Sequence, residues 1–89
     1  MVTIHFKVSG RVQGVYFRES AKKEAERLNI TGWVRNNPDN TVEGIACGTA
    51  ADIEAFKLWC STGPVMARVD HLDISPAEPI NSTRFEVQH

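Results

Sequence analysis

The sequence lacks long apolar runs and any excess of one charge. No segment of its 89 residues approaches the roughly 18 consecutive apolar residues of a transmembrane helix. Its start, MVTIHFKV, does not have the charged segment and apolar stretch of a secretory signal peptide. Ten Lys and Arg residues face eleven Asp and Glu residues, so the net charge of −1 attracts neither nucleic acids nor anionic membranes in general. We therefore expect no membrane partner and no nucleic-acid partner.

Cysteine is also scarce. Cys47 and Cys60 form no CxxC pair, and no histidine lies at zinc-finger spacing from them. A short secreted chain usually carries more cysteines. These facts predict free thiols in a reducing cytoplasm, with Cys60 in the core. No group of His, Asp and Glu residues has metal-ligand spacing either, so we expect neither a metal nor another cofactor.

Length and composition predict one globular domain spanning residues 1–89. A typical domain has about 100–200 residues, which leaves no room for a second. Hydrophobic residues make up 42% of the chain, enough for one modest core, and 24% charged residues are ordinary for a folded protein. The sequence contains no internal repeat and no low-complexity segment.

The first half of the chain predicts a strand, a loop and a helix. Polar and apolar residues alternate over residues 2–8, which is typical of a half-buried strand. Two glycines interrupt this pattern and mark residues 10–16 as a loop. From Phe17 the apolar residues recur at helical spacing as far as Leu28, and Asn29 is expected to stop the helix.

The second half predicts a hairpin, a second helix and two further strands. Residues 30–36 and 41–48 form the hairpin, because the NPDN segment between them favours a turn. The second helix, capped by Thr49 or Asp52, ends at residues 61–64. A strand over residues 67–75, with a bulge between Val69 and Leu72, a loop over 76–82 and a strand over 83–88 follow.

This order predicts an α+β fold, the ferredoxin-like split βαβ sandwich. Two helices cover one face of an antiparallel sheet of four strands, and a short fifth C-terminal strand is added. The first two strands are joined by a helical crossover, so they run in the same direction. The loop after the first strand should therefore face Arg35, Asn36 and Asn37, which end the second strand.

The glycine-bounded loop indicates an anion site. Gly10 and Gly14 permit backbone conformations that bring N–H groups close to a ligand. No Ser, Thr, Asp or Asn precedes the helix to cap it, and Arg18 in its first turn opposes the helix dipole unless an anion is bound. An ordinary connecting loop, with water at the helix end, explains the same pattern. The segment GRVQG matches neither GxGxxG nor a P-loop.

Two longer motifs are residues 10–18, GRVQGVYFR, and residues 32–44, GWVRNNPDNTVEG. They resemble the first and the second signature of the acylphosphatase family. The resemblance covers nearly the whole chain. It implies metal-free hydrolysis of the carboxyl–phosphate bond of acyl phosphates to carboxylate and phosphate, so phosphate or sulfate should bind as product-like anions.

The resemblance also implies roles for particular residues. Backbone amides of the loop would bind the phosphoryl group, Arg18 would bind it too, and Asn36 would orient the attacking water. The family usually has glycine where this chain has Asn40, and asparagine is the residue next best able to adopt a left-handed conformation. The predicted loop residues are Gln13, Gly14, Val15, Tyr16, Phe17 and Arg18.

Two alternatives to the enzyme remain open at this point. One is a non-catalytic phosphate-binding or regulatory domain on the same fold, although binding alone would not need Asn36. The other is an RNA-binding domain, which the fold also hosts but which needs aromatic residues on the third strand. The expected third strand, TVEGIACG, has none.

Overall fold

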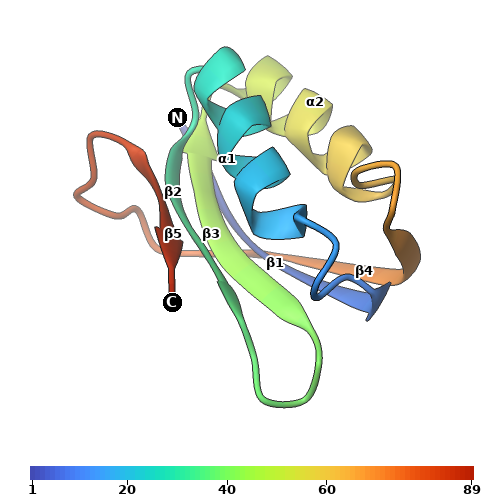
Figure 1. Cartoon of the computed structure of the whole chain (residues 1–89). Coiled ribbons are helices and arrows are strands. Elements are labelled where there is room, and N and C mark those ends of the chain that lie inside the picture. Colours follow the sequence, from blue (N-terminus) through green and yellow to red (C-terminus); the bar gives the residue numbers. More distant parts are fainter.

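Two helices pack side by side on one face of a five-stranded sheet (Figure 1). The computed structural model describes all residues from 1 to 89. The elements are β1 (Val2–Arg11), α1 (Phe17–Arg27), β2 (Thr31–Asn36), β3 (Val42–Gly48), α2 (Ala50–Cys60), β4 (Arg68–Pro76) and β5 (Phe85–Gln88). Every predicted element is present in the predicted order.

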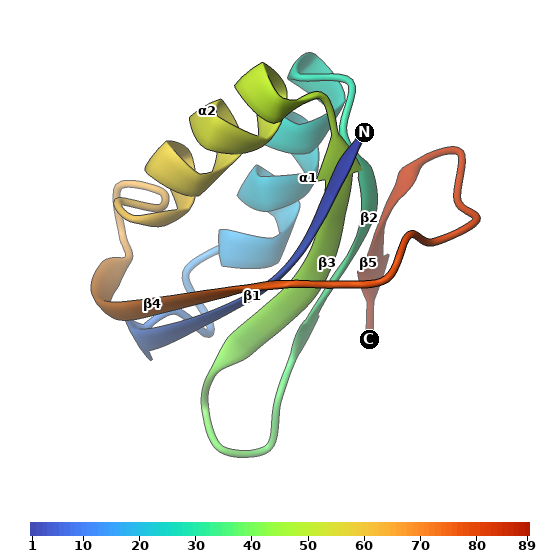
Figure 2. The ribbon, with the colours of Figure 1, turned by 180° about the vertical axis from the view of Figure 1, so that it is seen from behind.

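The strands are arranged β4-β1-β3-β2-β5 across the sheet. The first four form an antiparallel sheet, in which β1 lies between β4 and β3 and β3 pairs with β2. The short β5 lies parallel to β2, so the complete sheet is mixed. The predicted split βαβ sandwich is thus confirmed. Seen from behind, the face of the sheet opposite the helices carries no other element (Figure 2).

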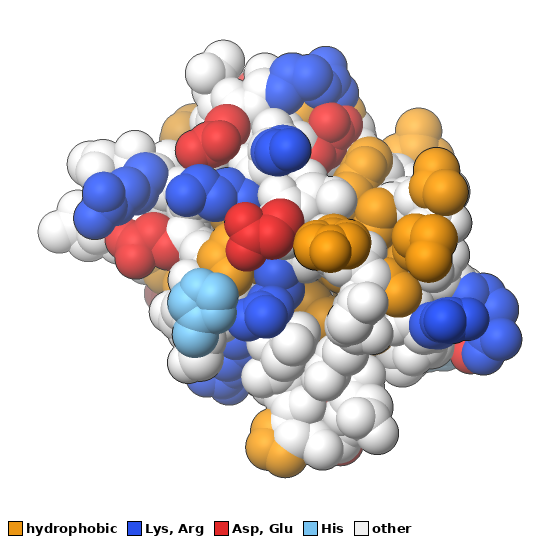
Figure 3. Space-filling model, viewed as in Figure 1, with side chains coloured by type: hydrophobic (Ala, Val, Ile, Leu, Met, Phe, Trp, Pro, Cys, Tyr) orange, Lys and Arg blue, Asp and Glu red, His pale blue; other side chains and the backbone are white.

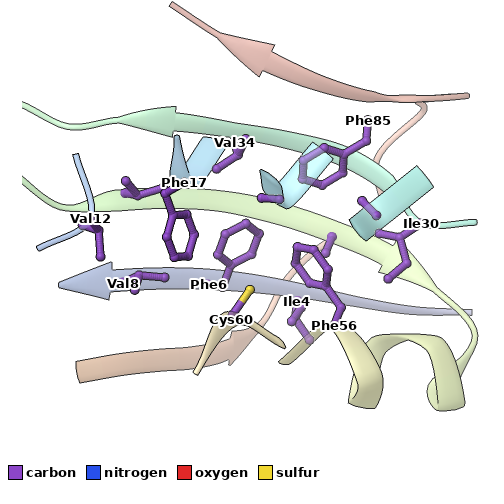
Figure 4. Close-up of a cluster of buried hydrophobic side chains, with 14 of the residues drawn as sticks. Ile4, Phe6, Val8, Val12, Phe17, Ile30, Val34, Phe56, Cys60 and Phe85 are labelled. Atoms are coloured by element: carbon purple, nitrogen blue, oxygen red, sulfur yellow. The ribbon is translucent and has the colours of Figure 1, made fainter. Parts of the chain in front are cut away.

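The core lies between the helices and the facing side of the sheet. Four phenylalanines are almost completely buried there: Phe6, Phe17, Phe56 and Phe85 (Figure 4). The rings of Phe6 and Phe56 meet edge to face at 5.4 Å between centroids. Burying each such side chain contributes about 1.5–3 kcal/mol relative to leaving it exposed. This packing holds α1 and α2 in place relative to the strand ends that carry the site.

The first strand is longer than its alternating pattern predicted. It continues through Gly10 to Arg11, which pairs with Arg68 of β4. Gly10 has a φ of 124°, and a Cβ there would lie 2.3 Å from the Arg68 carbonyl oxygen, so only glycine fits. The pairing shifts from Ser9 opposite His71 to Gly10 opposite Val69, which leaves Asp70 as the extra residue. The predicted bulge between Val69 and Leu72 is confirmed.

The residues predicted to end the first helix, to form the hairpin turn and to cap the second helix do so in the structure. Asn29 and Asn40 have φ values of 57° and 71°, so Asn40 takes the left-handed conformation that glycine would otherwise supply. The Thr49 hydroxyl caps α2 by accepting a hydrogen bond from the Asp52 N–H. Neither helix is long and apolar enough to cross a membrane.

Both cysteines are free and buried. Cys60 is fully inside the core, as predicted, and burial raises the pKa of its thiol far above the ordinary value. Because the thiolate is the nucleophile, this thiol is chemically inert in the folded protein.

Candidate functional site

A cleft of about 390 Å³ opens where the β1–α1 loop, the start of α1 and the end of β2 meet. The sequence predicts that these segments lie at the same end of the sheet, because β1 and β2 run in the same direction. Loop and asparagine therefore meet across the cleft although they are distant in the sequence. Its lining consists of Val12, Gly14, Tyr16, Phe17, Arg18, Glu19 and Asn36.

The start of α1 is a set of backbone donors without protein acceptors. Tyr16 occupies the N-cap position with a φ of 63° and makes no side-chain capping bond. The first helical bond runs from the Ser20 N–H to the Tyr16 carbonyl, and none of the backbone N–H groups of residues 13 to 19 donates a hydrogen bond within the protein. Such a helix start carries about half a positive charge and binds anions. The predicted lack of a cap is confirmed.

Arg18 brings a full positive charge to this cleft. Its Nη1 donates to the Gln88 carbonyl oxygen at 2.9 Å and lies 3.5 Å from His89 Nδ1. None of the ion pairs in the structure involves Arg18, so no carboxylate neutralises its guanidinium. The guanidinium is therefore held by one carbonyl and keeps donors for an anion.

Asn36 presents a polar group that the protein leaves unpaired. It is the last residue of β2, where it pairs with Val42 of β3. Its Oδ1 atom is buried and accepts no hydrogen bond. Since an unsatisfied buried acceptor costs about 1–3 kcal/mol, such atoms are uncommon and are often explained by function. Asn36 as a residue lines the cleft that also contains Arg18.

Gln13 ties the loop to the β2–β3 hairpin. Its Nε2 donates to the carbonyl oxygens of Asn37 at 2.8 Å and Thr41 at 2.9 Å. The sequence suggested a role only for the Gln13 backbone. The contact of its side chain escaped prediction because the partners are 24 and 28 residues away. The loop and the end of β2 are thus held together by a side chain.

Replacing Gln13 with methionine should loosen this connection. The variant keeps the side-chain length but removes both hydrogen bonds, while the carbonyl oxygens of Asn37 and Thr41 each keep one backbone donor. We expect the free energy of unfolding to fall by about 1–3 kcal/mol, measured by urea denaturation. Gln88→Met is the matched control, since the exposed Gln88 side chain makes no hydrogen bond. Equal stability of the two variants would contradict the structural role of Gln13.

Glu43 anchors the same hairpin from the open face of the sheet. Its carboxylate accepts from Arg35 Nη2 at 2.7 Å and contacts His5 Nε2 at 2.7 Å. Hydrogen bonding by Arg35, and next by His5, lowers the pKa of Glu43 below its ordinary value of 4.5. The carboxylate therefore stabilises the fold above that value, and the contribution disappears as the pH falls through the lowered pKa.

Acid denaturation should reveal this contribution. The free energy of unfolding of the wild type should fall as the pH drops from 5 toward 3. Over the same range the free energy of unfolding of Glu43→Gln should fall by about 1 kcal/mol less than that of the wild type. The mostly exposed Glu54, paired with Lys57 within one helix, supplies the control Glu54→Gln. A Glu43→Gln profile parallel to that of the wild type would contradict the assignment.

The fold and the cleft together define the class of protein. It is a small α+β protein with a candidate anion-binding site at the start of a helix. Unpaired backbone N–H groups and the Arg18 guanidinium can donate to the anion, and the Asn36 side chain belongs to the same cleft. No three His, Cys, Asp or Glu side chains lie close enough together to hold a metal ion. The arrangement suits binding of a phosphoryl group and positioning of a water molecule beside it.

Comparisons with known proteins identify the family. The acylphosphatase family model matches residues 4–87. The acylphosphatase of Thiobacillus denitrificans is 49% identical over 78 residues, which cover 88% of each chain. The crystal structure of the Bacillus subtilis acylphosphatase superposes with a TM-score of 0.95 at 29% identity, covering both chains completely. The Coxiella burnetii acylphosphatase structure has a TM-score of 0.94 at 40% identity, over 98% of this chain and 92% of that one.

The chain therefore belongs to the acylphosphatase family, a family of hydrolases that act on the acid anhydride bond of acyl phosphates. The resemblance stated from the two motifs is confirmed. The family assignment also favours the enzyme over the non-catalytic and RNA-binding alternatives.

Proposed function

We propose that the cleft hydrolyses acyl phosphates with Arg18 and Asn36 as its catalytic residues. The backbone N–H groups of residues 13 to 18 and the Arg18 guanidinium hold the phosphoryl group, while Asn36 orients the attacking water. One observation carries this proposal: Arg18, which has no ion-pair partner, and Asn36, whose amide oxygen is unpaired, line the same cleft as an uncapped helix start. An anion would accept hydrogen bonds from the helix N–H groups and from Arg18, and a water molecule would pair with the Asn36 side chain.

The reaction explains why so few groups suffice. A bond forms between the water oxygen and phosphorus, and the bond from phosphorus to the acyl oxygen breaks. The leaving carboxylate belongs to an acid with a pKa of about 4, so it departs without a proton and needs no general acid. Phosphoryl transfer has a loose transition state that depends mainly on positioning and charge stabilisation. We assign the proton released by the water to an oxygen of the phosphoryl group itself.

The negative charge of the phosphoryl oxygens is met by two kinds of donor. The N–H groups at the start of α1 are fixed by the helix and need no rearrangement during the reaction. The Arg18 guanidinium, steadied by the Gln88 carbonyl, can offer two parallel N–H groups to two oxygens. The transition state is thus stabilised by groups that are already in place.

Leaving-group selectivity tests the proposal. Benzoyl phosphate should be hydrolysed in excess EDTA at the rate found without it. Phosphoserine should react at least on the order of 10²–10⁴-fold more slowly in kcat/KM, because its alkoxide needs the proton that a general acid would donate. Phosphate release measures both rates. Loss of activity in EDTA that magnesium or zinc restores, or similar rates on both substrates, would overturn this mechanism.

Two further expectations belong with this proposal. We propose that residues 1–89 act as one domain, since a single cluster of buried side chains draws on both helices and on β1, β2, β3 and β5. We also propose that the protein works in the cytoplasm, where its two free cysteines would stay reduced.

A further inference from the structure

The two halves of the cleft lie on segments that separate at this end of the sheet. The pairing of β1 with β3 ends at Val8 opposite Val42, and beyond that pair β1 continues along β4 alone. The β2–β3 hairpin, which carries Asn36, extends past the start of α1 (Figure 1). No backbone hydrogen bond joins residues 12–19 to residues 36–41. The backbone ladders therefore do not fix the β1–α1 loop relative to Asn36.

The side chain of Gln13 supplies the polar connection between these two segments. Its Nε2 donates one hydrogen to the Asn37 carbonyl and the other to the Thr41 carbonyl. No other hydrogen bond joins the loop and the start of α1 to the hairpin, because Arg18 donates to β5 instead. One amide group thus makes both hydrogen bonds between the loop and the hairpin.

Charge contributes little to holding the hairpin in place. On the face seen in Figure 3, mostly uncharged atoms cover the hairpin, whereas charged side chains gather over α1. One ion pair reaches the turn: Lys7 Nζ lies 3.5 Å from Asp39 Oδ2, and both side chains are partly exposed. Exposed pairs of this kind contribute little, and this pair starts from β1 rather than from the loop. The neutral hydrogen bonds of Gln13 are thus the directional contacts between loop and hairpin.

The Gln13 side chain acts on the hairpin and not on the substrate. Gln13 is not among the residues that line the cleft, and the hairpin carbonyls already accept from both hydrogens of its Nε2 atom. Val12 and Val15 of the same loop are buried, so the loop itself is anchored in the core. Gln13 therefore connects an anchored loop to the residue that directly follows Asn36.

The proposed reaction is sensitive to the spacing of these segments. The loop holds the phosphoryl group and Asn36 holds the water, so the distance from the water oxygen to phosphorus depends on how loop and hairpin are placed. Reacting atoms must approach to about 3–3.5 Å, and a misplacement of about 1 Å can cost roughly 10²-fold in rate. Apolar packing has no directional preference, whereas two hydrogen bonds restrict both distance and orientation.

We propose that the Gln13 side chain is a positioning residue, which holds Asn36 in place relative to the phosphoryl group. It raises kcat in this way without adding to the affinity for phosphate. This inference rests on the proposed function and adds the contact that sets the geometry of its site. Because Gln13 acts through Asn36, its effect on kcat depends on the presence of the Asn36 amide.

A double-mutant cycle of Gln13→Met and Asn36→Ala tests the inference, with benzoyl phosphate as the substrate. Gln13→Met keeps the side-chain length and loses the donors, so kcat should fall about 10-fold. The affinity for inorganic phosphate, measured by calorimetry, should be unchanged. In the Asn36→Ala background the same replacement should lower kcat by less than about 2-fold, because the group that Gln13 positions is absent.

Two further variants separate positioning from a general loss of stability. Thr49→Ala removes the cap of α2, which follows the end of β3 far from the hairpin, so it destabilises the fold but should keep the wild-type kcat. Gln13→Asn keeps the amide but is one methylene group shorter, so it cannot reach the hairpin carbonyls. It should lower kcat as Gln13→Met does, and it replaces that variant if Gln13→Met fails to fold. Circular dichroism at the assay temperature monitors folding.

A wild-type kcat in folded Gln13→Met or Gln13→Asn would overturn the inference. So would an equal fall in kcat with and without Asn36, a loss of phosphate affinity as large as the loss of kcat, or a matching fall in Thr49→Ala. An Asn36→Ala variant with the wild-type kcat would instead overturn the proposed function, so the two failures are distinguishable.

Discussion

Arg18→Ala is expected to reduce kcat/KM for an acyl phosphate on the order of 10³-fold and to weaken inorganic phosphate as a competitive inhibitor. The guanidinium contacts the phosphoryl group in substrate, transition state and product, so both quantities should change. No other cationic side chain lines the cleft to replace it. Steady-state kinetics give the first quantity, and calorimetry with phosphate gives the second.

Arg18→Lys should restore little of this loss. An ammonium group is a compact charge and cannot place two parallel N–H groups on two phosphoryl oxygens. Lys23→Ala is the control, because Lys23 is an exposed cation of the same helix outside the cleft. If a folded Arg18→Ala variant bound phosphate as tightly as the wild type, Arg18 would not hold the phosphoryl group.

Asn36→Ala should lower kcat without weakening the binding of phosphate. Phosphate affinity should stay nearly constant, because the N–H groups and Arg18 remain. The value of kcat should fall by about 10²–10³-fold, the loss seen when one positioned transition-state donor is removed. The physical reason is that the water loses the group that orients it toward phosphorus. Calorimetry with phosphate and single-turnover kinetics measure the two effects.

Folding must be monitored in this comparison, because Asn36 ends a strand of the hairpin. Circular dichroism provides that check. Asn37→Ala is the neighbouring control, since the Asn37 side chain donates to Thr41 Oγ1 within the hairpin and does not line the cleft. It should keep the wild-type kcat. A folded Asn36→Ala variant that lost phosphate binding but kept its kcat would reverse the roles assigned to the two residues.

Local patterns in the sequence were enough to predict the elements and their order. Strict alternation over residues 2–8 predicts a half-buried strand because side chains of a strand point alternately to its two faces. The apolar stripe from Phe17 to Leu28 predicts α1 for the corresponding helical reason. These signals act within a few residues of one another, so they can be recognised without knowing the rest of the fold.

The proximity of the β1–α1 loop to Asn36 could also be predicted, because it depends on topology alone. A helical crossover makes β1 and β2 run in the same direction, and their ends then share one edge of the sheet. The residues before Phe17 include no capping side chain, and Arg18 places a positive charge in the first turn, so the sequence alone predicts both features. Together these features predict the position of the cleft, and the roles of Arg18 and Asn36 in catalysis stay predictions.

The tertiary structure alone decided how the site is held together. The Gln88 carbonyl steadies Arg18 from 70 residues away, and this contact depends on β5 pairing parallel to β2. Neither that pairing nor the hydrogen bonds from the Gln13 side chain to the hairpin produce a periodic or local pattern in the sequence. Such contacts follow from the relative placement of packed elements, which is set by burial of the common core rather than by any one segment. The sequence thus determined which groups face the cleft, while packing decided which contacts orient them.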